Sequence, residues 1–143
     1  MSIAMSQSLR MWIATTVISL LGIVGAVPTY ANSMLIRIAE VQIEPPYFDE
    51  YLAILREEAE ASIRLEPGVI SIFPMLQKDD PTKVRILEIY ASRGAYEEHL
   101  TTAHFKKYKA TTMKMVKSLA LVDMQPVDVE TMTKIFSKAG VGK

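Results

Sequence analysis

The chain has 143 residues, half of them apolar, with 16 basic and 16 acidic side chains, two histidines and no cysteine. This length suits one domain with a single core. The balanced charge argues against nucleic acid as a partner, because phosphate binding needs clustered cationic side chains. Without cysteine the chain forms no disulfide and no thiolate site, and two histidines alone predict no metal site.

The first 31 residues differ in composition from the rest. Arg10 is their one charged residue, and it precedes an apolar run from Met11 to Ala26 that ends in small residues. This pattern is typical of a secretory signal peptide. We therefore expect residues 1–31 to be a leader, and the protein to be periplasmic or secreted.

Three alternatives to this interpretation remain open. Cleavage after Ala26 fits the small-residue rule as well as cleavage after Ala31 does. An uncleaved leader would anchor the protein, which would then contact the membrane only through that segment. If Met34 is the true start, the protein is cytoplasmic.

Residues 32–127 are predicted to form one α+β domain, followed by a C-terminal tail at 128–143. Apolar residues alternate in the predicted strands and recur every three or four positions in the predicted helices. Thr101 or Thr102 is placed to cap the second long helix. The predicted elements are a strand at 34–43, a helix at 47–64, a strand at 69–76, a hairpin loop at 77–83, a strand at 84–91, a short helix at 92–100, a longer helix ending near 118 and a strand at 119–127.

The order β-α-β-β-α-β is that of a ferredoxin-like unit, an antiparallel sheet with its helices on one face. Such a sheet is expected to be polar on the face that the helices leave open. The predicted second strand instead carries apolar residues at both even and odd positions, for example Ile72 and Phe73. The sequence therefore predicts that a second copy of the chain covers the open face, as a homodimer.

Several short motifs follow one another through this domain. They are Glu66-Pro67-Gly68, Asp80-Pro81, Glu88-Ile89-Tyr90, Ala95 with His99, and Ala103-His104-Phe105. In this order and spacing the sequence resembles the antibiotic biosynthesis monooxygenase family, also called the quinol monooxygenase-like family of dimeric α+β barrels. The resemblance extends over roughly residues 34–127. It implies a dimeric α+β barrel and an oxygenase that uses no metal, flavin or other cofactor.

Such an oxygenase must take a proton from a phenol or hydroquinone, so that the resulting anion can reduce dioxygen. This chemistry requires a base, a group that stabilises the oxyanion, and a dry pocket. The candidate catalytic residues are His99, His104 and Glu88. Each residue also has a purely structural interpretation. His99 fits a residue at the boundary between core and solvent, His104 fits a helix cap, and Glu88 fits an ion-pair partner of Arg37.

The substrate is expected to be a small aromatic or quinol-like molecule that lies against aromatic and apolar side chains, with dioxygen as co-substrate. Most of these side chains also fit the core of the domain. The candidate substrate-binding residues are Arg37, Phe48, Tyr51, Phe73, Tyr90, Phe105, Tyr108 and Met115.

Two other functions fit the same residues. One is a non-catalytic dimer that binds a small aromatic ligand. The other is an isomerase of the type that processes autoinducer-2, which also uses a histidine and a carboxylate for proton transfer. A haem-degrading branch of the fold is disfavoured, because the resemblance implies a pocket tryptophan and Trp12 lies in the leader.

Overall fold

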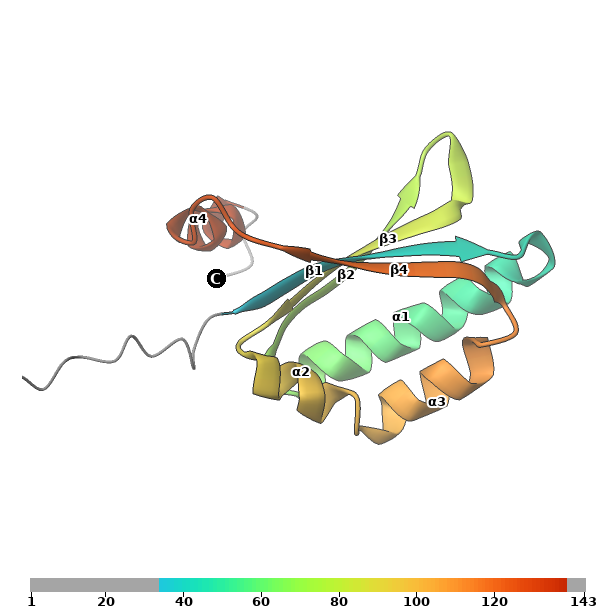
Figure 1. Ribbon diagram of the computed structural model, residues 1–143, viewed down its shortest axis with the longest axis horizontal. Coiled ribbons are helices and arrows are strands. Elements are labelled where there is room, and N and C mark those ends of the chain that lie inside the picture. The colour runs from blue at the N-terminus through green and yellow to red at the C-terminus, as the bar shows by residue number, and fades with distance from the viewer. Residues whose placement is uncertain (1–33, 139–143) are drawn as a thin grey trace, which may run out of the picture.

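The computed structural model describes residues 34–138 (Figure 1). The predicted leader and the end of the predicted tail lie outside these residues. The elements are β1 (Leu35–Ile43), the 3₁₀ helix η2 (Pro45–Tyr47), α1 (Phe48–Leu65), β2 (Val69–Gln77), β3 (Asp80–Tyr90), α2 (Arg93–His99), α3 (Ala103–Thr112), β4 (Val116–Met124) and α4 (Glu130–Lys138).

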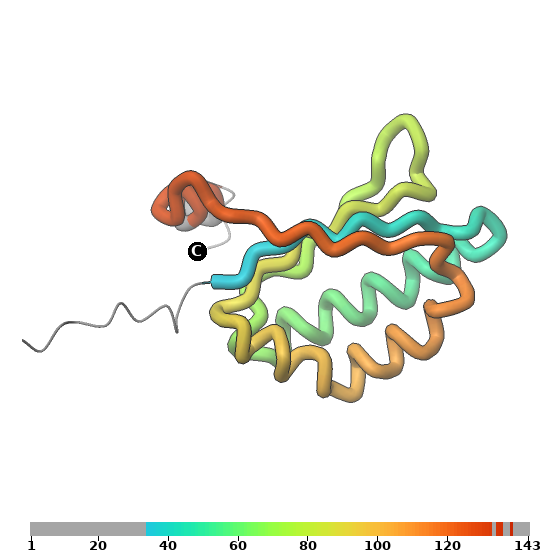
Figure 2. Tube along the Cα trace, in the orientation of Figure 1, coloured from blue at the N-terminus to red at the C-terminus, as the bar shows by residue number. Residues whose placement is uncertain are grey.

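The four strands form one sheet in the order β2-β3-β1-β4, and every neighbouring pair is antiparallel. Helices α1, α2 and α3 all lie on one face of this sheet, while α4 extends beyond the end of β4 (Figures 1 and 2). The predicted ferredoxin-like α+β fold is therefore confirmed.

The core lies between the sheet and α1, on the face that we call the helix face. Val84 and Ile43 are fully buried there, together with Tyr51 and Leu55 of α1. Burial of these apolar side chains is the main stabilising contribution to the fold. Strand periodicity places the alternate residues of β1 and β3 on the opposite, open face of the sheet.

The open face carries a row of apolar residues that crosses all four strands. The strand register aligns Val122, Ile38, Leu87 and Phe73 in one row across the sheet. Phe73 is 58% exposed and Val122 is 41% exposed, although both are large and apolar. Exposed apolar patches of this kind are characteristic of interaction surfaces.

The hairpin between β2 and β3 is tighter than the sequence predicts. Gln77 pairs with Asp80, so only Lys78 and Asp79 form the turn, and β3 begins four residues before the predicted Val84. The Asp80 carboxylate accepts hydrogen bonds from the Thr82 backbone and hydroxyl groups. These bonds satisfy polar groups in the segment, so it forms a strand although its polar composition predicts a loop.

The second long helix is shorter than predicted. Its cap is Thr102, whose hydroxyl accepts the N–H of Phe105, but α3 ends at Thr112 rather than near 118. Met115 then occupies a turn where its carbonyl accepts the N–H of Glu44, and Val116 pairs with β1. Pairing of β4 with β1 outweighs the helical periodicity that continues through this segment.

Beyond the sheet, the predicted tail forms helix α4, in which Ile135 is 59% exposed. None of the helices between residues 34 and 138 is both long and apolar enough to cross a membrane.

Candidate functional site

A cavity of about 360 Å³ lies between the helix face of the sheet and helices α2 and α3. It exists because α1 packs under β2 while α3 packs mainly against α1, which leaves space below β1 and β4. Its walls are mostly apolar and aromatic, as in small-molecule sites. The residues that line it are Arg37, Ala39, Val41, Ile86, Glu88, Tyr90, Tyr96, His99, Leu100, Phe105, Tyr108, Lys109, Thr112, Met113, Val116, Leu119 and Leu121.

Two charged groups stand side by side on the sheet wall of this cavity. Arg37 of β1 is the register partner of Glu88 of β3, so both side chains project from the helix face. Burial raises the pKa of Glu88 above its usual value, and this effect outweighs the hydrogen bond from Tyr90 and the charge of Arg37. The protonated form of Glu88 is therefore favoured more than that of an exposed glutamate.

Arg37 is held rigidly in this wall. Its guanidinium pairs with Asp123 of β4 at 2.7 Å and stacks 4.7 Å from the centre of the Tyr96 ring. Only 7% of the residue is exposed. A positioned guanidinium next to a base is suited to stabilise an oxyanion that forms between them.

Three phenols surround these charges. The hydroxyl groups of Tyr51 and Tyr108 are 2.7 Å apart, and the hydroxyl of Tyr90 donates to Glu88 at 3.3 Å. Burial raises the pKa of Tyr51 to about 12 and raises the pKa values of Tyr90 and Tyr108 further. All three therefore stay protonated at neutral pH: Tyr90 donates to Glu88, and one of the hydroxyls of Tyr51 and Tyr108 donates to the other.

His99 contributes the surface of its ring, rather than a free nitrogen, to the cavity wall. Its Nδ1 lies 3.0 Å from Glu66 Oε1, and its Nε2 lies 3.7 Å from the Glu58 carboxylate of α1. The ring packs 4.6 Å from that of Phe105 and is 3% exposed. Because both nitrogens face carboxylates, His99 is less well placed than Glu88 to take a substrate proton.

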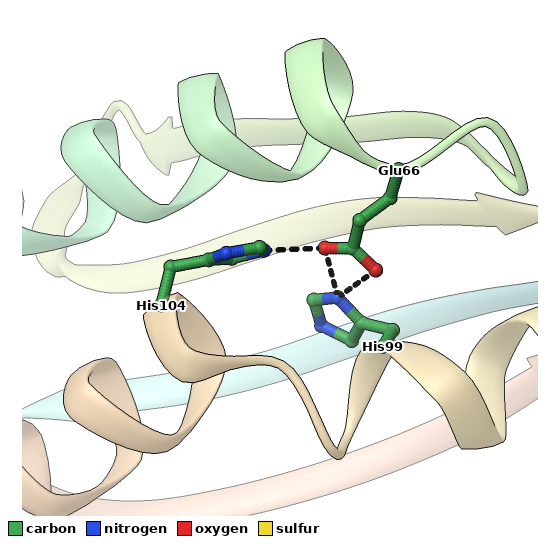
Figure 3. A group of neighbouring side chains, drawn as sticks. All are labelled: Glu66, His99 and His104. Carbon is green, nitrogen blue, oxygen red and sulfur yellow. Dashed lines mark hydrogen bonds and ion pairs between the residues drawn. The ribbon is translucent and has the colours of Figure 1, made fainter.

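His104 lies outside the cavity, on the far side of Glu66. Its Nε2 is 2.5 Å from Glu66 Oε1, so Glu66 bridges the two imidazoles (Figure 3). Burial would raise the pKa of Glu66, but the hydrogen bonds from both histidines outweigh it and lower the pKa. Burial raises the pKa of Glu58, whose carboxylate accepts the Ser62 hydroxyl at 2.7 Å.

The Glu-Pro-Gly turn explains how these side chains meet. Glu66 directly follows α1, and Gly68 accepts the N–H of Ala91 at the end of β3. A Cβ on Gly68 would lie only 2.5 Å from the Cβ of Ala95 in α2. The glycine therefore allows α2 to pack directly on the turn, which brings His99 to Glu66.

Replacing Gly68 with alanine is expected to lower the free energy of unfolding by about 1–3 kcal/mol, because the new methyl group overpacks the α2 contact. Chemical denaturation measures this change. The control is a protein that already carries Ala95→Gly and therefore lacks the methyl group at the contact. In that protein Gly68→Ala should lower the free energy of unfolding clearly less. An equal cost in both backgrounds would mean that the Ala95 contact does not explain the glycine.

The structure brings five of the predicted site residues to the cavity wall besides His99. They are Arg37, Glu88, Tyr90, Phe105 and Tyr108. Tyr51 lies behind this wall through its contact with Tyr108. Three other residues predicted to bind substrate do not line this cavity: Phe48, Phe73 and Met115. A bulge in β2 turns Phe73 to the open face, and the early end of α3 sends Met115 into the core.

Sequence reasoning missed two groups of residues. Glu66 was assigned only to a turn motif. Its position directly before Pro67-Gly68, where the turn restricts the backbone, could have indicated a carboxylate held in one place. Tyr96 and Leu121 line the cavity, but nothing in their local pattern distinguishes them from other amphipathic positions.

Comparison with known proteins places the chain in a family. The family model described as antibiotic biosynthesis monooxygenase matches residues 34–111. A comparison with curated proteins found no match.

Solved structures agree with this result. A candidate antibiotic biosynthesis monooxygenase from Bacteroides thetaiotaomicron is 45% identical, with a TM-score of 0.66 over 67% of this chain and 91% of that one. A protein from Mycobacterium tuberculosis is 25% identical, with a TM-score of 0.61 over 67% of this chain and 97% of that one. A candidate monooxygenase from Lactobacillus acidophilus is 26% identical, with a TM-score of 0.64 over 66% of this chain and 45% of that one.

The family model covers more than half of the chain, in the segment that carries β1 to α3 and therefore most of the cavity wall. The chain belongs to the antibiotic biosynthesis monooxygenase family.

Proposed function

We propose that the protein is a cofactor-independent monooxygenase of small phenolic or quinol-like molecules. Membership of the monooxygenase family supports an oxygenase, and the cavity supports a flat aromatic substrate. The observation that carries the proposal is that Arg37 and Glu88 lie opposite each other in neighbouring strands and both line the cavity.

Glu88 accepts the proton of the substrate hydroxyl, and Arg37 stabilises the phenolate that forms. The phenolate gives one electron to dioxygen, and the two radicals combine by forming a carbon–oxygen bond at a ring carbon that carries hydrogen, ortho or para to the phenolate oxygen. The peroxide anion that results takes back the proton from Glu88. The ring hydroperoxide then loses water and becomes a quinone. A phenol plus dioxygen thus gives a quinone plus water, and a hydroquinone plus dioxygen gives a hydroxyquinone plus water. In both cases the substrate supplies all four electrons and no external reductant is needed.

The surroundings of the pair suit this sequence of steps. Phe105 and Tyr96 offer ring faces against which an aromatic substrate can stack. The apolar wall excludes water, which strengthens the interaction of Arg37 with the phenolate. The Tyr90 hydroxyl, which donates to Glu88, holds the carboxylate in place.

An oxygen electrode tests the proposal directly. Purified protein is incubated with a panel of hydroquinones, naphthols and larger fused phenols, while quinone absorbance is followed in parallel. We expect enzyme-dependent uptake of one dioxygen per quinone formed from at least one substrate class. Absence of uptake across the panel would contradict an oxygenase.

The pH dependence follows from the raised pKa of Glu88. Only the ionised carboxylate accepts a proton, so kcat/KM is expected to fall as the pH drops through the pKa of Glu88. This limb should lie at higher pH than the pKa of an exposed glutamate, about 4.3. The assay uses a substrate whose own pKa is much higher, so that ionisation of the substrate does not overlap with the titration of Glu88. A flat profile across this range would exclude Glu88 as the base.

We also propose that the functional unit is a homodimer, joined through the open faces of two sheets. The apolar row across all four strands supports this, since exposed patches of that kind mark interaction surfaces. Members of the family of this chain are often dimeric.

We propose a periplasmic or secreted location on the basis of the predicted leader. Fractionation of cells that express the full chain tests this, with mass spectrometry of the mature N-terminus. A cytoplasmic protein that begins at Met34 would contradict it.

A further inference from the structure

Glu66, His99 and His104 form a compact group that the proposed oxygenation does not use. They come from the end of α1, the end of α2 and the start of α3, and their side chains converge (Figure 3). One potential ligand atom from each lies within 4.8 Å of the others. The group lies behind the His99 ring as seen from the cavity, so it is a site separate from Glu88.

We propose that this group binds a divalent transition-metal ion of the Zn²⁺ class, through His99 Nδ1, His104 Nε2 and the Glu66 carboxylate. Two imidazoles with one carboxylate are a common ligand set for Zn²⁺ and its first-row neighbours. Mg²⁺ and Ca²⁺ prefer sites made of oxygen alone. The metal proposal goes beyond the proposed function and does not depend on it.

The distances from Glu66 to the two histidines can be compared with those between ligand atoms around a metal ion. Two atoms that are each about 2.1 Å from one metal, at angles of about 90–110°, lie about 3.0–3.4 Å apart. His99 Nδ1 is 3.0 and 3.2 Å from the two Glu66 oxygens, which meets this condition. His104 Nε2, at 2.5 Å from Glu66, must move outward by several tenths of an ångström. The His104 side chain is 21% exposed and stands in the first turn of α3, so it has room to move.

One of the two histidines, His99, also faces the kind of outer partner that metal-binding histidines usually have. A histidine that binds a metal through one nitrogen usually directs the other nitrogen toward a carboxylate. His99 does this toward Glu58, at 3.7 Å, and Ser62 in turn donates to Glu58. Both Glu58 and Ser62 are buried, so this second carboxylate belongs to the interior of the fold and is not a surface charge.

An ion in this position would replace the protons that now join the two imidazoles to Glu66. It would tie the end of α1 to the corner between α2 and α3, directly behind one wall of the cavity. The partial exposure of His104 leaves one side of the ion open to water or to an exogenous ligand. We therefore expect bound metal to raise the thermal stability of the protein, because the ion binds only the folded arrangement.

The test uses the purified chain after chelator treatment, titrated with ZnCl₂ alone and with CoCl₂ alone. Calorimetry should give one site per chain, and Co²⁺ should develop visible absorption typical of nitrogen ligands. The chain has only two histidines, so a long-range ¹H–¹⁵N spectrum reports both imidazoles without ambiguity. Both sets of signals should shift when Zn²⁺ binds.

His104→Ala and Glu66→Gln are each expected to weaken the affinity at least 10-fold. Glu57→Gln is the matched control: this exposed glutamate on α1 pairs with Lys107 and should bind the ion as the wild type does. Circular dichroism and thermal melts establish whether each variant folds. If a variant fails to fold, the Co²⁺ absorption and the imidazole signals of the wild type decide whether these residues bind metal.

The proposal is overturned if the wild type binds neither ion saturably at submillimolar concentration, or if its imidazole signals do not shift. It is also overturned if folded His104→Ala and Glu66→Gln bind as tightly as the wild type. Oxygen uptake by the chelator-treated protein is read separately, so a failed metal site and a failed oxygenase are distinguishable.

Discussion

Glu88→Gln is expected to lower kcat/KM for a phenolic substrate by about 10²–10⁴-fold, because it removes the general base. Glutamine keeps the size of the side chain and can still accept the Tyr90 hydroxyl bond. The cavity should therefore retain its shape, and substrate or product should still bind with little change. The acidic limb of the pH profile should disappear together with the activity. Steady-state oxygen uptake and ligand titration by fluorescence measure the two effects.

Glu97→Gln is the control for this variant, since it makes the same change at an exposed position on α2. It should leave turnover unaltered. If Glu88→Gln retains wild-type turnover, Glu88 is not the base. If the wild type binds aromatic ligands but turns none over, the protein is a binding module rather than an oxygenase.

If the proposed homodimer forms through the open faces, Val122→Asp is expected to convert it into monomers. Val122 stands in the apolar row of the open face, next to Ile38, and is 41% exposed in the single chain. An aspartate there stays hydrated in the monomer but would be buried unpaired between two sheets. Burial of an unpaired carboxylate costs several kcal/mol, so we expect the dimer dissociation constant to rise by about 100-fold or more. Sedimentation at low micromolar concentration measures it.

Thr111→Asp is the matched control, because it adds the same charge at an exposed position of α3, on the helix layer. It should sediment as the wild type does. A wild type that is monomeric at these concentrations, or a Val122→Asp variant that stays dimeric, would contradict sheet-to-sheet association.

Most of the fold could be predicted because its signals are local. Alternation in β1, helical spacing in α1 and the threonine cap of α3 are each read within a dozen residues, and the structure has all three. The error at the end of α3 occurred where a distant strand decided the outcome. Val116 belongs to β4 because Ile43 pairs with it, although the local pattern continues the helix.

The candidate site divides in the same way. The proximity of Glu88 to the cavity follows from its position on an inward strand face, and the resemblance already pointed to it. The orientation of His99 does not follow, because its nitrogens are directed by Glu58 and Glu66, which are 41 and 33 positions away in the chain. The sequence alone therefore left the base open between a histidine and Glu88, whereas the geometry favours the carboxylate.

The sequence by itself determined the order of the elements, the apolar character of both sheet faces and the family, since these depend on local periodicity and short motifs. Only the tertiary structure decided which side chains share a cavity, that Arg37 stands beside Glu88, and that Glu66 joins both histidines. The physical reason is that strand register and helix packing depend on contacts between segments far apart in the chain, and no local pattern encodes those distances.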